Sequence, residues 1–130
     1  MASKVDRHER PYLIIVDDEI NFGESLQLAL DDVYDVLVTH SVEEARYSFR
    51  EKFPAVVLID MRLPDGDGID VLRELKLYGE MPIAIVMTAC VTRGNSVKAL
   101  KEGAADYITK PFEIDQLKRD IFRNLRKEHP

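Results

Sequence analysis

The segment AVVLIDMRLPDGDG, residues 55 to 68, joins an aliphatic run to a polar turn rich in aspartate and glycine. Its apolar residues follow one another without alternation. This pattern is typical of a strand in a parallel sheet, where helices bury both faces. The run ends at Asp60, and the turn leads into a stretch with helical periodicity. The segment therefore predicts an α/β fold in which a central strand carries a carboxylate at its carboxyl end.

Similar apolar runs recur along the chain. The five predicted strands are Tyr12–Asp17, Tyr34–Thr39, Ala55–Asp60, Pro82–Thr88 and Ala105–Lys110. Helical stretches follow them at Ile20–Leu30, after Ser41, at Gly68–Tyr78, Asn95–Glu102 and Ile114–Leu125. This alternation implies a parallel sheet with helices on both faces, joined by right-handed crossovers. The second and fifth runs are less apolar and suit the sheet edges. We therefore expect a flavodoxin-like, doubly wound (βα)5 fold with a five-stranded parallel sheet, order 2-1-3-4-5.

Local signals refine the helices. Ser41 followed by Glu44 predicts an N-terminal capping box for the second helix. Gly79 ends the predicted helix Gly68–Tyr78. The Asn95–Glu102 stretch is polar and small, which indicates the least stable helix of the domain. The last helix is amphipathic and basic, with Phe122 beside rather than on its apolar stripe.

Composition excludes several classes of protein. The chain has 130 residues, 45% hydrophobic content and a net charge of −6, which fit one globular domain and disfavour non-specific contact with nucleic acid or membrane. Its single cysteine, Cys90, rules out a disulfide framework. The polar N-terminus lacks a signal peptide and no apolar run could span a bilayer, so we expect a cytoplasmic protein. We expect the domain to span residues 11–127, with flexible ends at 1–10 and 128–130.

Polar groups stand at the ends of four predicted strands. They are the pair Asp17 and Asp18, then Asp60, Thr88 and Lys110. In doubly wound folds ligands bind outside the carboxyl ends of the strands, so these groups should meet there. Three carboxylates brought together repel each other, and a hard divalent ion such as Mg²⁺ relieves that repulsion. With Mg²⁺ and one lysine the site is formally neutral and can accept a phosphoryl group, for which Asp60 is the best placed nucleophile.

The ordered set of motifs resembles the receiver domain of bacterial response regulators from about Tyr12 to Leu125. The motifs are Asp17-Asp18-Glu19, VLIDMRLPDGDG at 57–68, Met87-Thr88-Ala89 and GAADYITKPF at 103–112. The resemblance implies that Asp60 is the phosphoacceptor. It implies that Mg²⁺ is bound by Asp17, Asp18, Asp60 and the backbone carbonyl of Arg62. It also implies phosphoryl-binding and switch roles for Thr88, Lys110 and Tyr107, and we expect a cis-proline at Pro111.

By the same resemblance, the phosphodonor is a sensor histidine kinase or a phosphotransfer protein. Phosphorylation should change the surface formed by the 95–102 helix, the 105–110 strand and the final helix. An output domain or partner, or a second copy on phosphorylation, should dock there, with Phe122 a candidate contact. Transcription regulation is the favoured output, through a module outside this chain, with no direct contact between this domain and nucleic acid. The only chemistry expected of the chain is self-phosphorylation and autodephosphorylation.

Other functions remain as alternatives. A phosphatase of the haloacid dehalogenase type also uses a nucleophilic aspartate, but needs a second aspartate two residues later, where Arg62 stands. A phosphorylation-independent interaction module would not need the Asp, Thr and Lys set. A calcium loop beginning at Asp65 fails because Lys76 occupies its twelfth position. The Gly66-Asp-Gly68 stretch lacks the third glycine of a dinucleotide motif.

Overall fold

The computed structural model describes residues 9–89 and 93–128. The expected flexible ends lie mostly outside these residues, as does Cys90. In chain order the elements are β1 (Tyr12–Val16), α1 (Ile20–Leu30), β2 (Asp35–Thr39), α2 (Val42–Glu51), β3 (Val56–Asp60), β4 (Arg62–Leu63), β5 (Gly66–Asp67), α3 (Gly68–Lys76), β6 (Ile83–Thr88), α4 (Arg93–Lys101), β7 (Asp106–Thr109) and α5 (Ile114–Glu128). None of the helices among these residues is long and apolar enough to cross a membrane.

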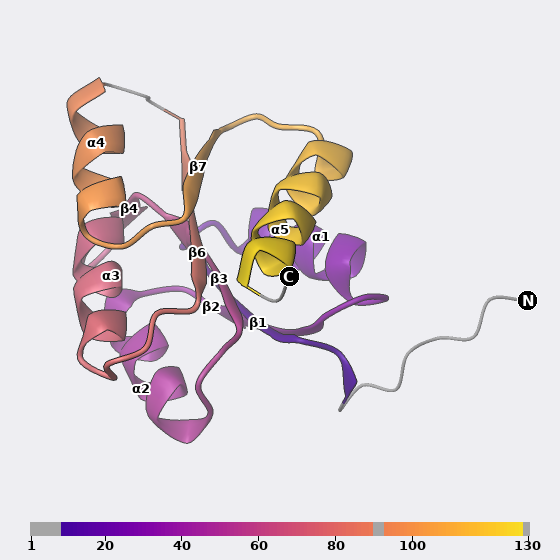
Figure 1. Cartoon of the computed structure of the whole chain (residues 1–130), viewed down its shortest axis with the longest axis horizontal. Coiled ribbons are helices and arrows are strands. Elements are labelled where there is room, and N and C mark those ends of the chain that lie inside the picture. Colours follow the sequence, from indigo (N-terminus) through magenta and orange to yellow (C-terminus); the bar gives the residue numbers. More distant parts are fainter. Residues whose placement is uncertain (1–8, 90–92, 129–130) are drawn as a thin grey trace, which may run out of the picture.

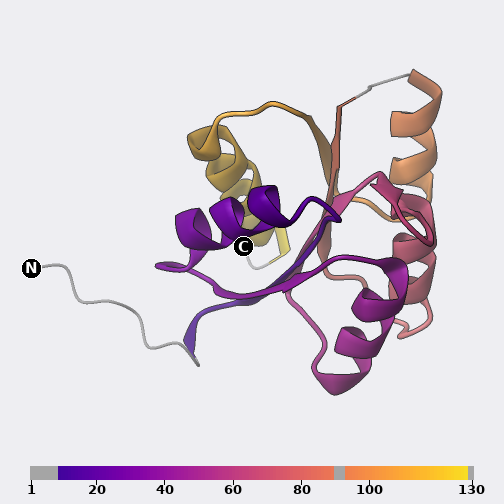
Figure 2. The ribbon, with the colours of Figure 1, turned by 180° about the vertical axis from the view of Figure 1, so that it is seen from behind.

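The main sheet is parallel and its five strands lie in the order β2-β1-β3-β6-β7. With the short β4–β5 hairpin set aside, this is the order 2-1-3-4-5 expected from the sequence. Helices α1 and α5 cover one face, and α2, α3 and α4 cover the other (Figure 1). The view from behind shows the same three layers (Figure 2). The expected doubly wound fold is therefore confirmed.

Strand β1 shows how the sheet separates two cores. Leu13 and Ile15 pack with Leu117 and Ile121 beneath α1 and α5. Ile14 and Val16 point the other way, into the cluster beneath α2, α3 and α4. These four of the five β1 residues are fully buried. Because alternate side chains enter opposite apolar layers, the strand reads as a continuous aliphatic run.

The β4–β5 hairpin is an element that the sequence analysis did not predict. Arg62 pairs with Asp67 and Leu63 with Gly66 in an antiparallel ladder. The hairpin leads into α3, where Asp67 and Asp70 form a capping box. At Ser41 only half of the expected box forms. The hydroxyl of Ser41 accepts a hydrogen bond from the backbone N–H of Glu44, whose carboxylate lies 3.6 Å from His40.

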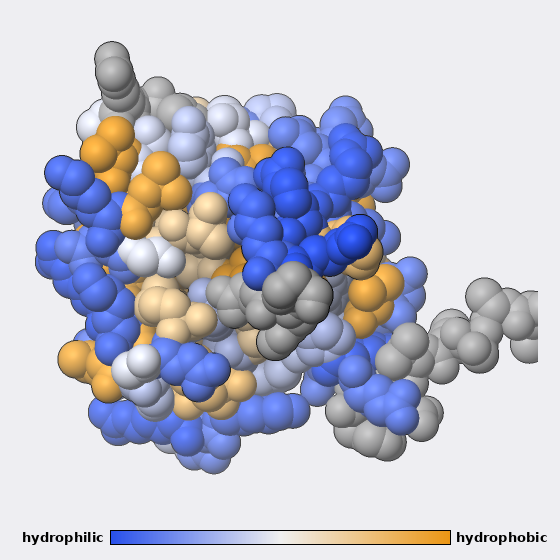
Figure 3. Space-filling view, viewed as in Figure 1, coloured by the Kyte–Doolittle hydropathy of each residue, from blue (hydrophilic) through white to orange (hydrophobic). Residues whose placement is uncertain are grey.

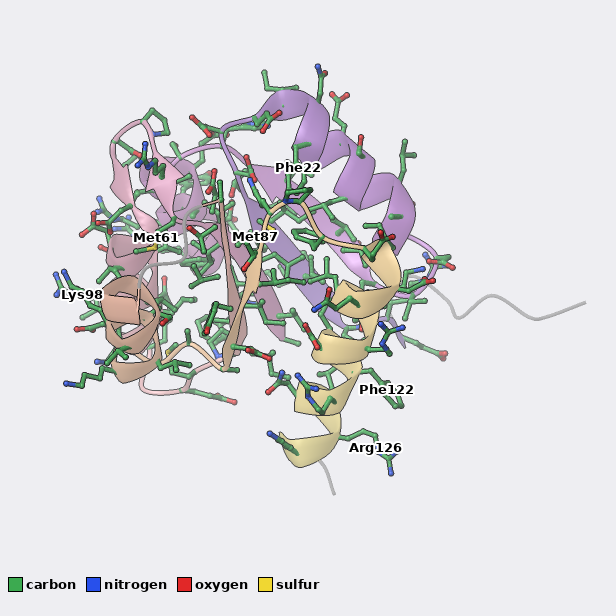
Figure 4. All side chains as sticks on the ribbon, turned by 90° about the horizontal axis from the view of Figure 1, so that it is seen from above. Phe22, Met61, Met87, Lys98, Phe122 and Arg126 are labelled. Atoms are coloured by element: carbon green, nitrogen blue, oxygen red, sulfur yellow. The ribbon has the colours of Figure 1, made fainter. Side chains whose placement is uncertain are left out.

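The face between α4 and α5 carries apolar and neutral side chains, between more hydrophilic helix surfaces (Figure 3). On α4, Val97 and Leu100 are 44% and 46% exposed. Phe122, expected on this face, lies elsewhere. It lines a hollow of about 290 Å³ with Val33 and Tyr34 from the α1–β2 connection. In Figure 4, Phe122 and Lys98 of α4 point in opposite directions. The expectation that Phe122 belongs to the α4–β7–α5 face is therefore wrong, because its ring projects from the side of α5 nearer the α1–β2 connection.

Candidate functional site

Three carboxylates meet at the carboxyl edge of the sheet. One oxygen from each of Asp17, Asp18 and Asp60 lies within 4.8 Å of the others. The parallel pairing of β1 with β3, which sets Val16 beside Ile59, brings the ends of these strands together. The three residues differ in exposure: Asp17 is buried, Asp60 is half-buried and Asp18 is exposed. This arrangement leaves Asp60 and Asp18 open toward solvent.

Asp17 is held rigidly. Its backbone N–H donates to the carbonyl of Thr39 at 3.0 Å. One carboxylate oxygen accepts a hydrogen bond from the backbone N–H of Glu19 at 2.9 Å. The other accepts one from the Lys110 ammonium at 2.7 Å. A fully buried carboxylate needs such partners, since unpaired burial of a charge is costly.

Lys110 reaches this edge from the end of β7. Its backbone N–H donates to the carbonyl of Thr88 at 2.8 Å, which continues the ladder between β6 and β7. The Lys110–Pro111 peptide bond is cis. The Lys110 Nζ lies 3.6 Å from a carboxylate oxygen of Asp60 as well as 2.7 Å from Asp17. The lysine side chain is only 15% exposed, so its charge acts within the cluster rather than in open solvent.

Burial and neighbouring charges both affect the pKa of the Asp60 carboxyl group. Burial raises the pKa of Asp60 above its ordinary value, and the Asp17 carboxylate raises it further. The Lys110 ammonium opposes the rise. The backbone N–H of Arg62 also donates weakly to Asp60, at 3.4 Å. Added positive charge would favour the ionised form of Asp60.

Thr88 and Tyr107 come from the two strands that follow β3 in the sheet. Thr88 ends β6 and is 9% exposed; it lies one residue beyond Met87, the register partner of Asp60. Tyr107 is the register partner of Val86. Its partly buried ring packs against the core on the α2, α3 and α4 side. Both residues therefore connect the carboxylate edge with the part of the sheet nearest α4.

The donor set fits a hard cation. The three clustered groups are all carboxylates, and oxygen ligands of this kind suit Mg²⁺. Burial, together with the Asp17 carboxylate, raises the pKa of Asp60, and the nearby Lys110 ammonium does not cancel this rise. Arg62, an exposed residue, lies two residues after Asp60 at the start of the hairpin. The residues present therefore fit the group that the sequence analysis expects.

Two contacting residues escaped the sequence analysis. Phe22, within the predicted helical stretch Ile20–Leu30, places its ring centroid 4.1 Å from the Lys110 Nζ. Asp65, taken as a turn residue, accepts hydrogen bonds from the backbone N–H groups of Val42 and Glu43 at the start of α2. Both contacts join segments that are far apart in sequence. Helical or strand periodicity, which is a local pattern, therefore cannot predict them.

Comparison with known proteins agrees with the resemblance that the sequence motifs indicate. A family model for the response regulator receiver domain matches residues 13–122. Over 120 residues the chain is 32% identical to the transcriptional regulatory protein KdpE of Staphylococcus aureus. That match covers 90% of this chain and 52% of KdpE, so the chain spans about half the length of this curated relative.

Solved structures share the fold. The signal receiver domain of a putative Luxo repressor protein from Vibrio parahaemolyticus superposes with a TM-score of 0.85 at 25% identity, covering 91% of this chain and 92% of that one. A CheY-like response regulator receiver domain protein from Methanospirillum hungatei JF-1 also gives 0.85, at 29% identity, covering 91% and 95%. The fold, the carboxylate edge and the family match together place this chain among the response regulator receiver domains of two-component signalling.

Proposed function

We propose that the domain is a switch that accepts a phosphoryl group on Asp60 with the help of Mg²⁺. The observation that supports this is the cluster of Asp17, Asp18 and Asp60, two of which, Asp17 and Asp60, lie beside the Lys110 ammonium. Asp60 is partly exposed to solvent. It lies beside the Asp17 carboxylate, which is negative, and the Lys110 ammonium, which is positive. It is the carboxylate best placed to act as a nucleophile toward a phosphoryl donor.

The transfer is a displacement at phosphorus. A carboxylate oxygen of Asp60 attacks the phosphorus of a phosphohistidine on a sensor kinase or phosphotransfer protein. The P–N bond breaks, its electron pair returns to the imidazole nitrogen, which takes up a proton, and an acyl phosphate remains on Asp60. Because such transfers depend mainly on positioning and charge, the residues around Asp60 do the catalytic work.

Mg²⁺ supplies positive charge against the phosphoryl oxygens when it is bound. Its proposed ligands are Asp17, Asp18, Asp60 and the backbone carbonyl of Arg62. Asp17 is already bonded to Lys110 and Glu19, so we assign it a supporting part. Asp18 is exposed and free to face an ion directly.

Lys110 and Thr88 would bind the phosphoryl group. The ammonium lies between Asp17 and Asp60 and can turn toward new acceptor oxygens on Asp60. The Thr88 hydroxyl stands at the end of the strand next to β3. A phosphoryl group adds a charge of about −1.5 to −2 at neutral pH, which makes both contacts charge-assisted.

The signal would leave the site through β6 and β7. A shift of Thr88 toward the phosphoryl group gives the Tyr107 ring room to turn inward. The surface formed by α4, β7 and α5 is then the one that changes and meets an output partner or a second copy. Residues 11–127 would form this receiver unit. KdpE is a transcriptional regulatory protein by name, so we propose transcription regulation through a separate output module.

Incubation with acetyl phosphate and Mg²⁺ tests the assignment of Asp60. We expect an acid-labile, hydroxylamine-sensitive phosphoryl label on the wild type and none on Asp60→Asn. Asp65→Asn is the matched control, since this aspartate lies outside the carboxylate cluster and should leave labelling intact. Label that persists in Asp60→Asn, or a wild type that takes up none, contradicts the proposal. The second result would favour a phosphorylation-independent interaction module.

A further inference from the structure

The ammonium group of Lys110 has an aromatic neighbour besides its two carboxylates. It lies 2.7 Å from Asp17, 3.6 Å from Asp60 and 4.1 Å from the ring centroid of Phe22. A cation at this distance over a ring face is attracted by the negative face of the π-system. Figure 4 shows Phe22 where the beginning of α1 meets the connection between β7 and α5.

A contact with the ring and the close approach of α1 to β2 fix the position of Phe22. Phe112 meets it edge to face, with ring centroids 5.8 Å apart and planes at 82°. The next residue, Gly23, brings α1 close to β2: a Cβ there would lie 2.9 Å from Cγ1 of Val38. Phe112 follows Lys110 by two residues, so one aromatic contact ties α1 directly to the segment that carries the lysine.

We propose that Phe22 is a positioning residue of the phosphoryl-transfer site, whose ring keeps the Lys110 ammonium between Asp17 and Asp60. The inference rests on the proposed function and extends it to a residue outside the carboxylate cluster. Phe22 does not touch the reacting atoms; it acts through Lys110.

The reason lies in the freedom of a lysine side chain. Its four-carbon stem is flexible, and its charge is strongly attracted by water. The ring closes one side of the path to solvent. A ring face also has no fixed hydrogen-bond direction. The ammonium can therefore turn from Asp17 toward phosphoryl oxygens on Asp60 and keep its aromatic contact throughout.

The contact predicts a specific kinetic result. Phe22→Leu keeps an apolar side chain but loses the aromatic face. With acetyl phosphate and Mg²⁺, we expect its phosphorylation rate to fall roughly three- to tenfold, the range that a cation–π contact of ordinary strength supplies. Phe22→Tyr retains the aromatic face and should keep most of the rate. Phe122→Leu is the matched control, because its exposed ring lies 5.7 Å from Arg126 on α5, away from the site, and its rate should not change.

A double-mutant cycle separates positioning from a general structural effect. In a Lys110→Met background, Phe22→Leu should change the affinity for beryllofluoride with Mg²⁺ by less than twofold, because the group through which it acts is gone. An equal loss of beryllofluoride affinity in both backgrounds overturns the inference. A Phe22→Leu protein that is phosphorylated as fast as the wild type also overturns it. Failure of the wild type itself to accept phosphate is a different result, which removes the proposed function.

A second measurement needs no phosphorylation. The ring current of Phe22 should shift the side-chain methylene protons of Lys110 upfield in the NMR spectrum. This shift should disappear in Phe22→Leu and persist in Phe22→Tyr and Phe122→Leu. Methylene resonances of Lys110 at ordinary positions in the wild-type protein would contradict the ring contact on which the inference depends.

Discussion

The carboxylate of Asp65 accepts a hydrogen bond of 2.8 Å from the backbone N–H of Val42, across 23 residues of sequence. Asp65 also accepts one from Glu43, at 3.0 Å. The β4–β5 hairpin, which begins two residues after Asp60, thus supplies the cap of a helix that precedes it in the chain. It joins the neighbourhood of the candidate phosphoacceptor to the first turn of α2.

Replacing Asp65 with alanine should lower the free energy of unfolding by about 1 kcal/mol, as is usual for the loss of a helix cap. Urea denaturation followed by circular dichroism would measure this. Asp32→Ala, a change at an exposed aspartate outside any element, is the control and should have little effect.

The same cap should depend on pH. The backbone N–H of Val42 holds the pKa of Asp65 below its ordinary value. A carboxyl group whose pKa is lower in the folded state stabilises the fold above its unfolded pKa of about 3.9, and this contribution is lost as pH falls through the lower folded value. The difference in stability between wild type and Asp65→Ala should therefore shrink below about pH 4. A constant difference from pH 7 to the acid transition would contradict the assignment.

Asp60 should behave in the opposite way in the metal-free protein. Burial raises its pKa, so ionised Asp60 costs stability at neutral pH, and this cost is removed as pH falls through the raised value. Asp60→Asn should therefore be more stable than the metal-free wild type at pH 7. Thermal melting in the presence of a chelator would measure the difference. A variant less stable than the wild type would show that Asp60 is better stabilised by its neighbours than its environment indicates.

Mg²⁺ should raise the melting temperature, because an ion that binds only the folded state stabilises that state by mass action. Asp18→Ala should remove most of this response, since Asp18 is the exposed member of the cluster. Asp32→Ala again serves as the control and should respond like the wild type. A full response in Asp18→Ala would place the ion elsewhere.

Two glycines in helices should respond differently to alanine. In Gly94→Ala the new Cβ meets no atom within 4 Å, so better helix propensity should raise stability by about 0.5–1 kcal/mol. In Gly23→Ala the Cβ would meet Val38 at 2.9 Å, and this overpacking should more than offset the gain in propensity. Chemical denaturation of both variants would show opposite signs. Gly23→Ala should also slow phosphorylation, because it displaces the turn that carries Phe22.

Adding beryllofluoride and Mg²⁺ should shift backbone amide resonances most strongly in β6, β7, α4 and the near face of α5. Thr88 and Lys110 lie on or next to these strands, and Tyr107 joins them to the core beneath α4. Changes concentrated in α2 instead would mean that the signal leaves through the Asp65 cap rather than through Tyr107.

Much of this architecture was predictable from the sequence. Strands such as β3 are buried on both faces and therefore read as unbroken aliphatic runs, which gives both their number and their parallel arrangement. Because parallel strands end at one edge, the meeting of Asp17, Asp18 and Asp60 also followed from the sequence. The regular elements differ from expectation mainly at their ends, as where α4 begins at Arg93.

What could not be predicted depends on contacts between distant segments. The β4–β5 hairpin has two-residue strands, too short for any periodicity. The hydrogen bond from Val42 to Asp65 and the edge-to-face contact of Phe22 with Phe112 depend on how the helices lie on the sheet. The direction in which Phe122 points depends on the rotation of α5 about its axis, which a partly apolar helix face leaves undetermined.

The ion pair between Lys110 and Asp17 closes a loop of 93 residues. Asp17 follows β1 and Asp60 ends the neighbouring strand β3, both in the first half of the chain, but the lysine follows β7, the last strand of the sheet. A chain still emerging from the ribosome, or one that has lost β7 to local unfolding, holds the aspartates without their counter-charge. If Asp60 accepts a phosphoryl group as proposed, full competence to do so belongs to the folded molecule, and incompletely folded copies would not signal.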